Sequence, residues 1–227
     1  PDAFYDETIE VDLGKIEPAV AKPHFPDQYS EVKRLGKIKL DQVAIGSCTN
    51  SSYVDLMKVA SILDGKKVHP DVSLVISPGS ATILEKISEN GALATMIKAG
   101  ARILESGCGP CIGMGQAPKS GGVSLRSFNR NFKGRSGTAD ANVYLASPET
   151  CAASAVLGYI ADPSEIEYEE NFEKEVNFDH TDAYFIEPET DLSKRIKETI
   201  KGKNIKSFPR AEKAADIDKK VIYKVKG

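Results

Sequence analysis

Three cysteines lie in turn-forming sequence, where a thiol can reach a ligand. Cys48 follows a short apolar run and precedes Thr-Asn-Ser-Ser, while Cys108 and Cys111 form a Cys-Gly-Pro-Cys motif. A thiol beside a helix N-terminus lies in the positive field of the helix dipole, which favours the thiolate. Two thiolates three positions apart can bind one inorganic core, and the glycine and proline let backbone amides approach its sulfur atoms. The spacing therefore indicates a metal or iron–sulfur site.

A third polar segment, residues 127–135, follows another apolar run. It contains Asn129, Arg130, Asn131 and Arg135. Guanidinium groups bind carboxylates through paired hydrogen bonds, so this segment is suited to an anionic substrate.

The Cys-Gly-Pro-Cys motif by itself leaves several kinds of chemistry open. It is also the redox motif of thioredoxin-like proteins, but the glycines and proline that follow it disfavour the long helix of that motif, and the chain has no Trp. A structural zinc site would need a fourth ligand, and Cys151 lies in an alanine-rich stretch where a buried core thiol is expected. Three thiolates instead fit a [4Fe-4S] cluster with one iron open to substrate, whereas electron carriers normally saturate all four irons.

The elements that must position these residues alternate between strands and helices. Apolar runs predict strands at residues 43–45, 72–76, 101–104, 123–128 and 143–146. Helical spacing predicts helices at residues 53–63, around 83–87, at 93–99 and at 148–159, with capping oxygens at residues 50–52 and Pro148 in a first turn. This order predicts a three-layer α/β/α fold with a mostly parallel sheet, whose ligands bind beyond the carboxyl ends of the strands.

Four segments together resemble, in order and spacing, the cluster-binding third domain of the aconitase family. They are residues 45–51 (Ile-Gly-Ser-Cys-Thr-Asn-Ser), 108–113 (Cys-Gly-Pro-Cys-Ile-Gly), 127–135 (Ser-Phe-Asn-Arg-Asn-Phe-Lys-Gly-Arg) and 146–149 (Ala-Ser-Pro-Glu). Residues 77–80 are similar to the family's turn after the next strand, and residues 208–211 to its linker towards a mobile swivel domain.

The resemblance implies a role for each polar residue of these segments. In aconitases three cysteines bind a [4Fe-4S] cluster, and its fourth iron binds a substrate hydroxyl and carboxylate. The implied cluster ligands here are Cys48, Cys108 and Cys111. The implied carboxylate-binding residues are Arg130 and Arg135, and the implied supports of the cluster are Asn129 and Asn50. Asn50 could equally cap the helix that follows it.

The resemblance also implies an activity, the interconversion of citrate and isocitrate through cis-aconitate with the open iron as Lewis acid. Loss of the C–H proton needs a base, which the family carries on the swivel domain, so we expect the isolated chain to lack activity. The implied partners are the tricarboxylate substrate and the remaining aconitase domains of the same protein. The related isopropylmalate and homoaconitate dehydratases are the alternative within the family. They share the Cys-Thr-Asn and Asn-Arg-Asn-Phe elements, but the Cys-Gly-Pro-Cys motif and the linker favour aconitase itself.

The amino-acid composition further narrows the class of protein. The 227 residues carry 30 Lys+Arg against 33 Asp+Glu, a net charge of −3, which disfavours a generally basic nucleic-acid binder. A cluster-free, RNA-binding aconitase relative is the alternative of another class. No run of about 18 apolar residues predicts a membrane span. Four cysteines are too few for a disulfide scaffold, so we expect a cytoplasmic protein, or a mitochondrial matrix protein in a eukaryote.

Three regions are expected along the chain. Residues 1–40 are predicted to be an extended lead-in, 41–162 the α/β cluster-binding domain, and 163–227 an extension and linker towards a missing C-terminal swivel domain. The last residues, 221–227, have the composition of a strand that has just begun. We therefore expect the sequence to be a piece of a larger protein.

Overall fold

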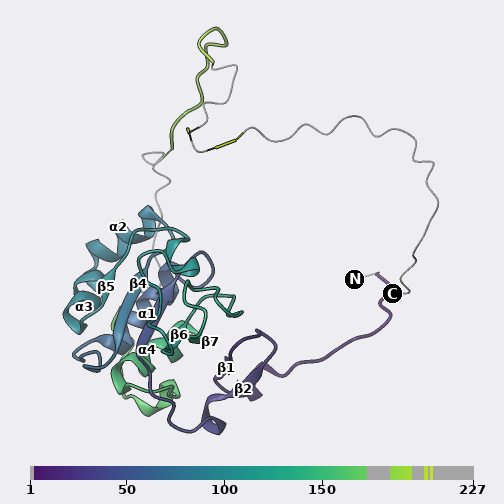
Figure 1. Cartoon of the computed structure of the whole chain (residues 1–227), viewed down its shortest axis with the longest axis vertical. Coiled ribbons are helices and arrows are strands. Elements are labelled where there is room, and N and C mark those ends of the chain that lie inside the picture. Colours follow the sequence, from purple (N-terminus) through teal and green to yellow (C-terminus); the bar gives the residue numbers. More distant parts are fainter. Residues whose placement is uncertain (1–2, 173–184, 196–201, 204, 207–227) are drawn as a thin grey trace. The chain divides into compact units, whose positions relative to one another are not determined.

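The computed structural model describes residues 3–172, 185–195, 202–203 and 205–206 (Figure 1). Contacts divide the chain into two units, Pro1–Thr181 and Asp182–Gly227, and every candidate site residue lies in the first. In the second unit, the carboxylate of Asp191 accepts a hydrogen bond from the Ser193 amide (3.0 Å). The strand predicted at 221–227 and the linker segment 208–211 lie outside the described residues.

The described residues form one sheet of seven strands in the order β2-β1-β7-β6-β3-β4-β5. The strands are β1 (Ala19–Ala21), β2 (Tyr29–Glu31), β3 (Gln42–Gly46), β4 (Ser73–Ser77), β5 (Arg102–Ile103), β6 (Val123–Arg126) and β7 (Asn142–Leu145). Strands β7, β6, β3, β4 and β5 pair in parallel, while β1 is antiparallel to both β7 and β2. The prediction of an α/β fold with a mostly parallel sheet is confirmed.

The helices follow the predicted order along the chain. They are α1 (Tyr53–Leu63), α2 (Ala81–Glu89), α3 (Ala92–Ala99) and α4 (Pro148–Leu157), with 3-10 turns η1 (Leu13–Lys15), η2 (Val32–Arg34), η3 (Gly109–Ile112) and η4 (Pro163–Glu165). Helix α1 begins where Ser52 and Asp55 form a capping box, which satisfies two backbone amides. Helix α4 begins after Ser147, whose side chain accepts from the Thr150 amide, and has Pro148 at its first turn as predicted.

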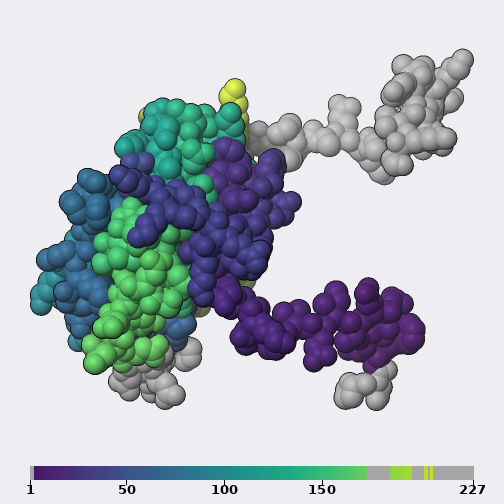
Figure 2. Space-filling model, turned by 90° about the horizontal axis from the view of Figure 1, so that it is seen from below, coloured from purple at the N-terminus to yellow at the C-terminus, as the bar shows by residue number. Residues whose placement is uncertain are grey.

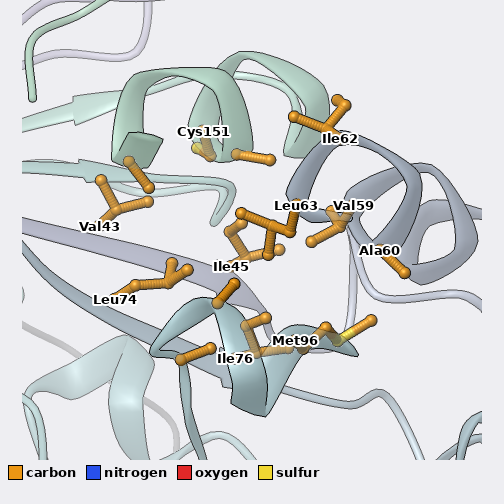
Figure 3. Packing of buried hydrophobic residues seen from close by; sticks show 14 of the residues in the cluster. Val43, Ile45, Val59, Ala60, Ile62, Leu63, Leu74, Ile76, Met96 and Cys151 are labelled. Carbon is orange, nitrogen blue, oxygen red and sulfur yellow. The ribbon is translucent and has the colours of Figure 1, made fainter. Parts of the chain in front are cut away.

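The two faces of the sheet are covered by different structures. Alternate residues of a strand point to opposite faces. Val43 and Ile45 join the large core cluster that contains residues of α1, α3 and α4, which Figure 3 shows at close range. Ala44 instead packs in a second cluster with Cys111 and Phe128. The fold therefore has three layers, and η3 with the residues around it covers the face opposite the helices.

Part of the expected lead-in belongs to the sheet. In β1, Val20 is buried and its neighbour Ala21 pairs with Leu145 of β7. The Leu40 amide donates to the Gly158 carbonyl (3.0 Å), and Figure 2 shows the indigo residues before β3 against the green surface around α4. The division at residue 40 stays a prediction. In the described part of the chain, no helix has the length and apolar character needed to span a membrane.

Candidate metal and anion site

The predicted site segments follow the carboxyl ends of the five parallel strands. These strands end at Gly46, Ser77, Ile103, Arg126 and Leu145, and each is followed by one segment of the resemblance or, after β5, by the loop that leads to η3. Along the chain, β3, β4 and β5 extend the sheet in one direction, and β6 then pairs on the other side of β3. The order reverses between β3 and β6, which is where open α/β sheets bind ligands.

The turn that carries Cys48 depends on Gly46. Gly46 has φ +132°, and a Cβ atom built there would lie 2.1 Å from the carbonyl oxygen of Ser77 on the neighbouring strand. Ser47 follows with φ +71°, a left-handed conformation that is uncommon outside glycine. The Gly46 amide donates to the hydroxyl of Ser127 (2.8 Å), which ties this turn to the segment after β6. The chain therefore reverses sharply and presents Cys48 at the surface.

The Cys48 thiol lies among hydrogen-bond donors. Its Sγ atom is 3.6 Å from the hydroxyl of Thr49 and 3.8 Å from that of Ser47. These hydroxyls, Thr49 first, lower the pKa of Cys48 below that of an ordinary thiol, and Cys108 adds a smaller contribution in the same direction. Hydrogen bonds to sulfur favour the thiolate, which is the form that binds metals.

The Cys-Gly-Pro-Cys segment forms the single turn η3, so Cys108 and Cys111 lie at its start and within it. The Cys111 amide donates to the Cys108 carbonyl (3.1 Å), and Cys111 is buried whereas Cys108 is exposed. Arg135 donates through Nη2 to the Cys111 sulfur at 3.5 Å. A guanidinium from the segment after β6 is thus placed beside the second cysteine of the motif.

The two asparagines predicted to support a cluster join the loops after β3 and β6. Asn50 Nδ2 donates to the carbonyl of Ser127, and Asn129 Nδ2 donates to Thr49 Oγ1 at 3.3 Å. Ser52 caps α1, so Asn50 is left for this bridge. Asn50 lies two residues after Cys48, and Asn129 is bonded to Thr49, a hydrogen-bond partner of Cys48, but contact of either amide with a cluster stays a prediction.

The two arginines have different surroundings. Arg130 is exposed and makes no hydrogen bond or ion pair with the residues that the structure describes. Arg135 is half-buried, lies over the ring of Phe132 (5.7 Å) and keeps a buried Nε atom without a partner among the described residues. Buried donors are normally paired, so this one suits an anionic group bound next to Cys111.

The structure brings the predicted cysteines together in part. Cys108 contributes to the lowered pKa of Cys48, and Cys111 contacts Arg135. Among the described residues, no three His, Cys, Asp or Glu side chains gather closely enough to hold a metal ion. The donor chemistry nevertheless fits an iron–sulfur cluster. A thiol of lowered pKa favours the thiolate that binds iron, and an unpartnered buried guanidinium N–H suits an anionic sulfide group.

Cys151 is separate from the site. It is completely buried in α4, and burial raises the pKa of its thiol strongly. The prediction of a core thiol is confirmed.

Sequence reasoning missed three residues that build the site. Thr49 and Ser127 supply the contacts to Cys48, Asn50 and Asn129, and Arg126 is wholly buried beneath η3. The signal for Arg126 was present, because a charged residue interrupts an otherwise buried strand.

Comparison with known proteins decides the family. The model of the aconitase family (aconitate hydratase) matches residues 1–158 of this chain. The chain belongs to the aconitase family. It is 49% identical over 168 residues to the 3-isopropylmalate dehydratase large subunit of Moorella thermoacetica, a match that covers 73% of this chain and 40% of the relative. It is 44% identical over 171 residues to the homoaconitase large subunit of Thermus thermophilus, covering 75% and 41%.

A third relative matches this chain with similar identity and coverage. The 3-isopropylmalate dehydratase large subunit of Clostridioides difficile is 48% identical over 168 residues, covering 73% of this chain and 39% of the relative. The chain thus spans about 40% of the length of the curated relatives that it matches.

These relatives contradict the expectation of a citrate–isocitrate isomerase. At 44–49% identity they carry the names that we set as the alternative within the family. The error has a physical reason: the cysteine turns and the Asn-Arg-Asn-Phe segment are expected to serve a cluster and carboxylates, which the alternatives share. Those motifs identified the family correctly but could not distinguish its substrates.

Proposed function

We propose that this chain is the cluster-binding part of the large subunit of a hydro-lyase that acts on 3-isopropylmalate. The observation that carries the proposal is the 49% identity to a 3-isopropylmalate dehydratase large subunit over 73% of the chain. Homoaconitate is the second candidate substrate, because a homoaconitase large subunit is 44% identical. Both proposals keep the hydro-lyase chemistry of the aconitase family.

Cys48, Cys108 and Cys111 would hold a [4Fe-4S] cluster in this protein. When bound, the cluster supplies a Lewis-acidic iron that assists departure of the substrate hydroxyl. The lowered pKa of Cys48 and the guanidinium of Arg135 beside Cys111 support this assignment. Asn50 and Asn129 would fix the loops from which the thiols project, because each joins the segment after β3 to the segment after β6.

Arg130 and Arg135 would bind the carboxylates of the substrate. Each guanidinium can form two parallel hydrogen bonds to one carboxylate, and two arginines match a dicarboxylate. Arg135 is already held by Cys111 and Phe132, so it would bind the carboxylate nearest the cluster. Arg130 is exposed and free to meet the other.

The rest of the catalytic apparatus would come from outside this chain. We assign no general base to the residues that the structure describes, and elimination of water needs one. The relatives are named large subunits, which supports a companion subunit as a partner beside the remainder of the large subunit. The cytoplasmic location remains our proposal, based on cysteine usage.

Turnover by the intact protein tests the substrate. After anaerobic reconstitution with iron and sulfide, 3-isopropylmalate, homoaconitate and citrate are compared by kcat/KM. We expect 3-isopropylmalate to be preferred; preference for citrate would overturn the proposal.

Cysteine variants test the ligand assignment separately. Cys48→Ala should lose the cluster, measured by bound iron and sulfide and by visible absorption, whereas the matched variant Cys151→Ala should keep it. Retention of a complete cluster by Cys48→Ala would refute the assignment.

A further inference from the structure

Arg126 is a buried charge that the proposed function does not use. It is the last residue of β6, its side chain is completely buried, and it is the largest fully buried side chain in the described part of the protein. Burying a guanidinium is costly unless its donors are satisfied. None of its described hydrogen-bond partners is a carboxylate, so this charge is not part of an ion pair.

The guanidinium group of Arg126 instead joins three segments of the chain, namely β3, β6 and the loop that contains η3. Nη1 donates to the carbonyl of Pro110 (2.7 Å), inside the Cys-Gly-Pro-Cys motif. Nη2 donates to the carbonyl of Gln116 (2.8 Å) and to Oε1 of Gln42 on β3 (2.7 Å). Nε donates to the hydroxyl of Ser124 (3.0 Å).

These contacts enclose the second cysteine of the motif. Pro110 precedes Cys111, and Gln116 lies five residues after Cys111, where its amide donates to the Gly113 carbonyl (3.3 Å). Gln42 supports the same loop by donating through Nε2 to the carbonyl of Ala117 (3.3 Å). Several carbonyls of the loop, that of Pro110 among them, also accept from amides of the loop itself. The donors that tie the loop to the sheet are side chains, those of Arg126 and Gln42 and, from β5, Arg102, which donates to the carbonyl of Gly115 and to Oε1 of Gln116 (2.6 Å).

The charge also lies close to the site. Arg126 stacks over the ring of Phe128 (5.4 Å), which belongs to the same small cluster as Cys111. Burial lowers the pKa of Arg126 to about 10, while the nearby Cys111 acts in the opposite direction. The group therefore remains a cation at neutral pH.

We propose that Arg126 is a positioning residue, which holds the Cys-Gly-Pro-Cys loop against β3 and β6 and places a fixed positive charge behind Cys111. The loop-holding part stands on the hydrogen bonds alone. The part that concerns a bound cluster rests on the proposed function, because a cation behind one ligand would stabilise an anionic cluster and its reduced state.

Hydrogen exchange in the metal-free intact protein tests the loop-holding part. In Arg126→Met, amides of residues 108–117 should exchange about tenfold faster than in the wild type, while those of β4 stay protected. Arg126→Lys keeps the charge but cannot reach four acceptors with one nitrogen, so the same amides should exchange several-fold faster. The control Arg34→Met, which removes an exposed arginine paired with Glu31, should change neither region.

The outcomes separate this proposal from its alternatives. Wild-type protection of the loop in Arg126→Lys overturns it, and so does equal loss of protection in β4 and the loop, because the residue would then be a general core support. If Arg126→Met does not fold, Arg126→Lys decides alone.

The reduction potential of the reconstituted cluster tests the electrostatic part. It should become more negative in Arg126→Met and stay near the wild-type value in Arg126→Lys, because only the first loses the charge. Equal potentials in all three proteins would overturn the electrostatic part. Absence of a cluster from the wild type would contradict the proposed function, while hydrogen exchange would still decide the role of Arg126.

Discussion

Replacing Gly46 by alanine should destabilise this fold far more than a typical glycine-to-alanine change. Gly46 is the last residue of β3 and lies opposite Ser77 of β4 in the parallel ladder. A Cβ atom at this position would be 2.1 Å from the Ser77 carbonyl oxygen, about 0.9 Å inside the 3.0 Å limit that real Cβ contacts respect. The obstacle is backbone, so no side-chain rotation can relieve it.

Two costs combine at this position. The φ of +132° is unfavourable for any residue with a Cβ atom, at about 1–2 kcal/mol. Overpacking that forces a backbone shift costs about 1–3 kcal/mol more. We therefore expect the free energy of unfolding to fall by about 3–4 kcal/mol, a large part of the total of a typical domain.

Gly65 provides the matched control. It also has positive φ, +68°, but a Cβ atom there would meet nothing within 4 Å. Gly65→Ala should therefore lower the free energy of unfolding only by the conformational cost of a positive φ, about 1 kcal/mol. Both free energies of unfolding are measured by urea titration followed by circular dichroism. If Gly46→Ala were no less stable than Gly65→Ala, the close approach of β3 and β4 at the Cys48 turn would be refuted.

Three other changes probe the core, the helix ends and the site loop. In metal-free protein, iodoacetamide should modify Cys48 at least about tenfold faster than Cys151, because the Cys151 thiol is buried and has a raised pKa. The two rates are measured by mass spectrometry of the labelled peptides, and equal rates would contradict this difference in burial. Burial alone would raise the pKa of Glu149, but its hydrogen bond with Lys58 (2.8 Å) lowers the net value below the usual 4.5. The ionised pair should therefore stabilise the fold above about pH 4.5 and lose that effect as pH falls through the lowered pKa. Glu149→Gln should cost about 1 kcal/mol at pH 7 and almost nothing at pH 3 in urea unfolding, and an equal cost at both pH values would contradict the pairing. Asn131→Ala removes the side-chain amide that donates to the carbonyls of residues 22 (2.8 Å) and 143 (3.2 Å). The free energy of unfolding should therefore fall by about 2 kcal/mol. An unchanged free energy of unfolding would mean that water replaces the lost amide donor.

The predictable part of the fold is the part that local chemistry determines. The apolar run at 43–45 predicts a buried strand, and β3 is buried at every position. Ser52 and Asp55 stand at the spacing of a capping box, and α1 begins there with both hydrogen bonds formed. Such signals lie within a few residues of one another, so they can be read along the chain.

The unpredicted part depends on partners far apart in sequence. Asn50 could cap a helix or bridge to another loop, and only the pairing of β3 with β6 brings the carbonyl of Ser127 within its reach. The cover of the second sheet face could not be foreseen for the same reason. Periodicity predicts helices on a sheet, whereas the 3-10 turn η3 lies there because Arg126 and Gln42 hold its loop.

The mistaken substrate follows from what the two arginines can recognise. Arg135 is fixed against Cys111 and Phe132. In our proposal it selects a carboxylate placed beside the proposed cluster ligands, and every candidate substrate has one. Arg130 is exposed, so its side chain could bind a second carboxylate at any of several positions. In our proposal the two arginines bind the carboxylates that all candidates share, and not the group in which the candidates differ, an isopropyl chain in one and a further carboxylate-bearing chain in the others. We therefore propose that discrimination depends on residues outside the segment 127–135. Exchanging only this segment between family members should leave their substrate preference unchanged.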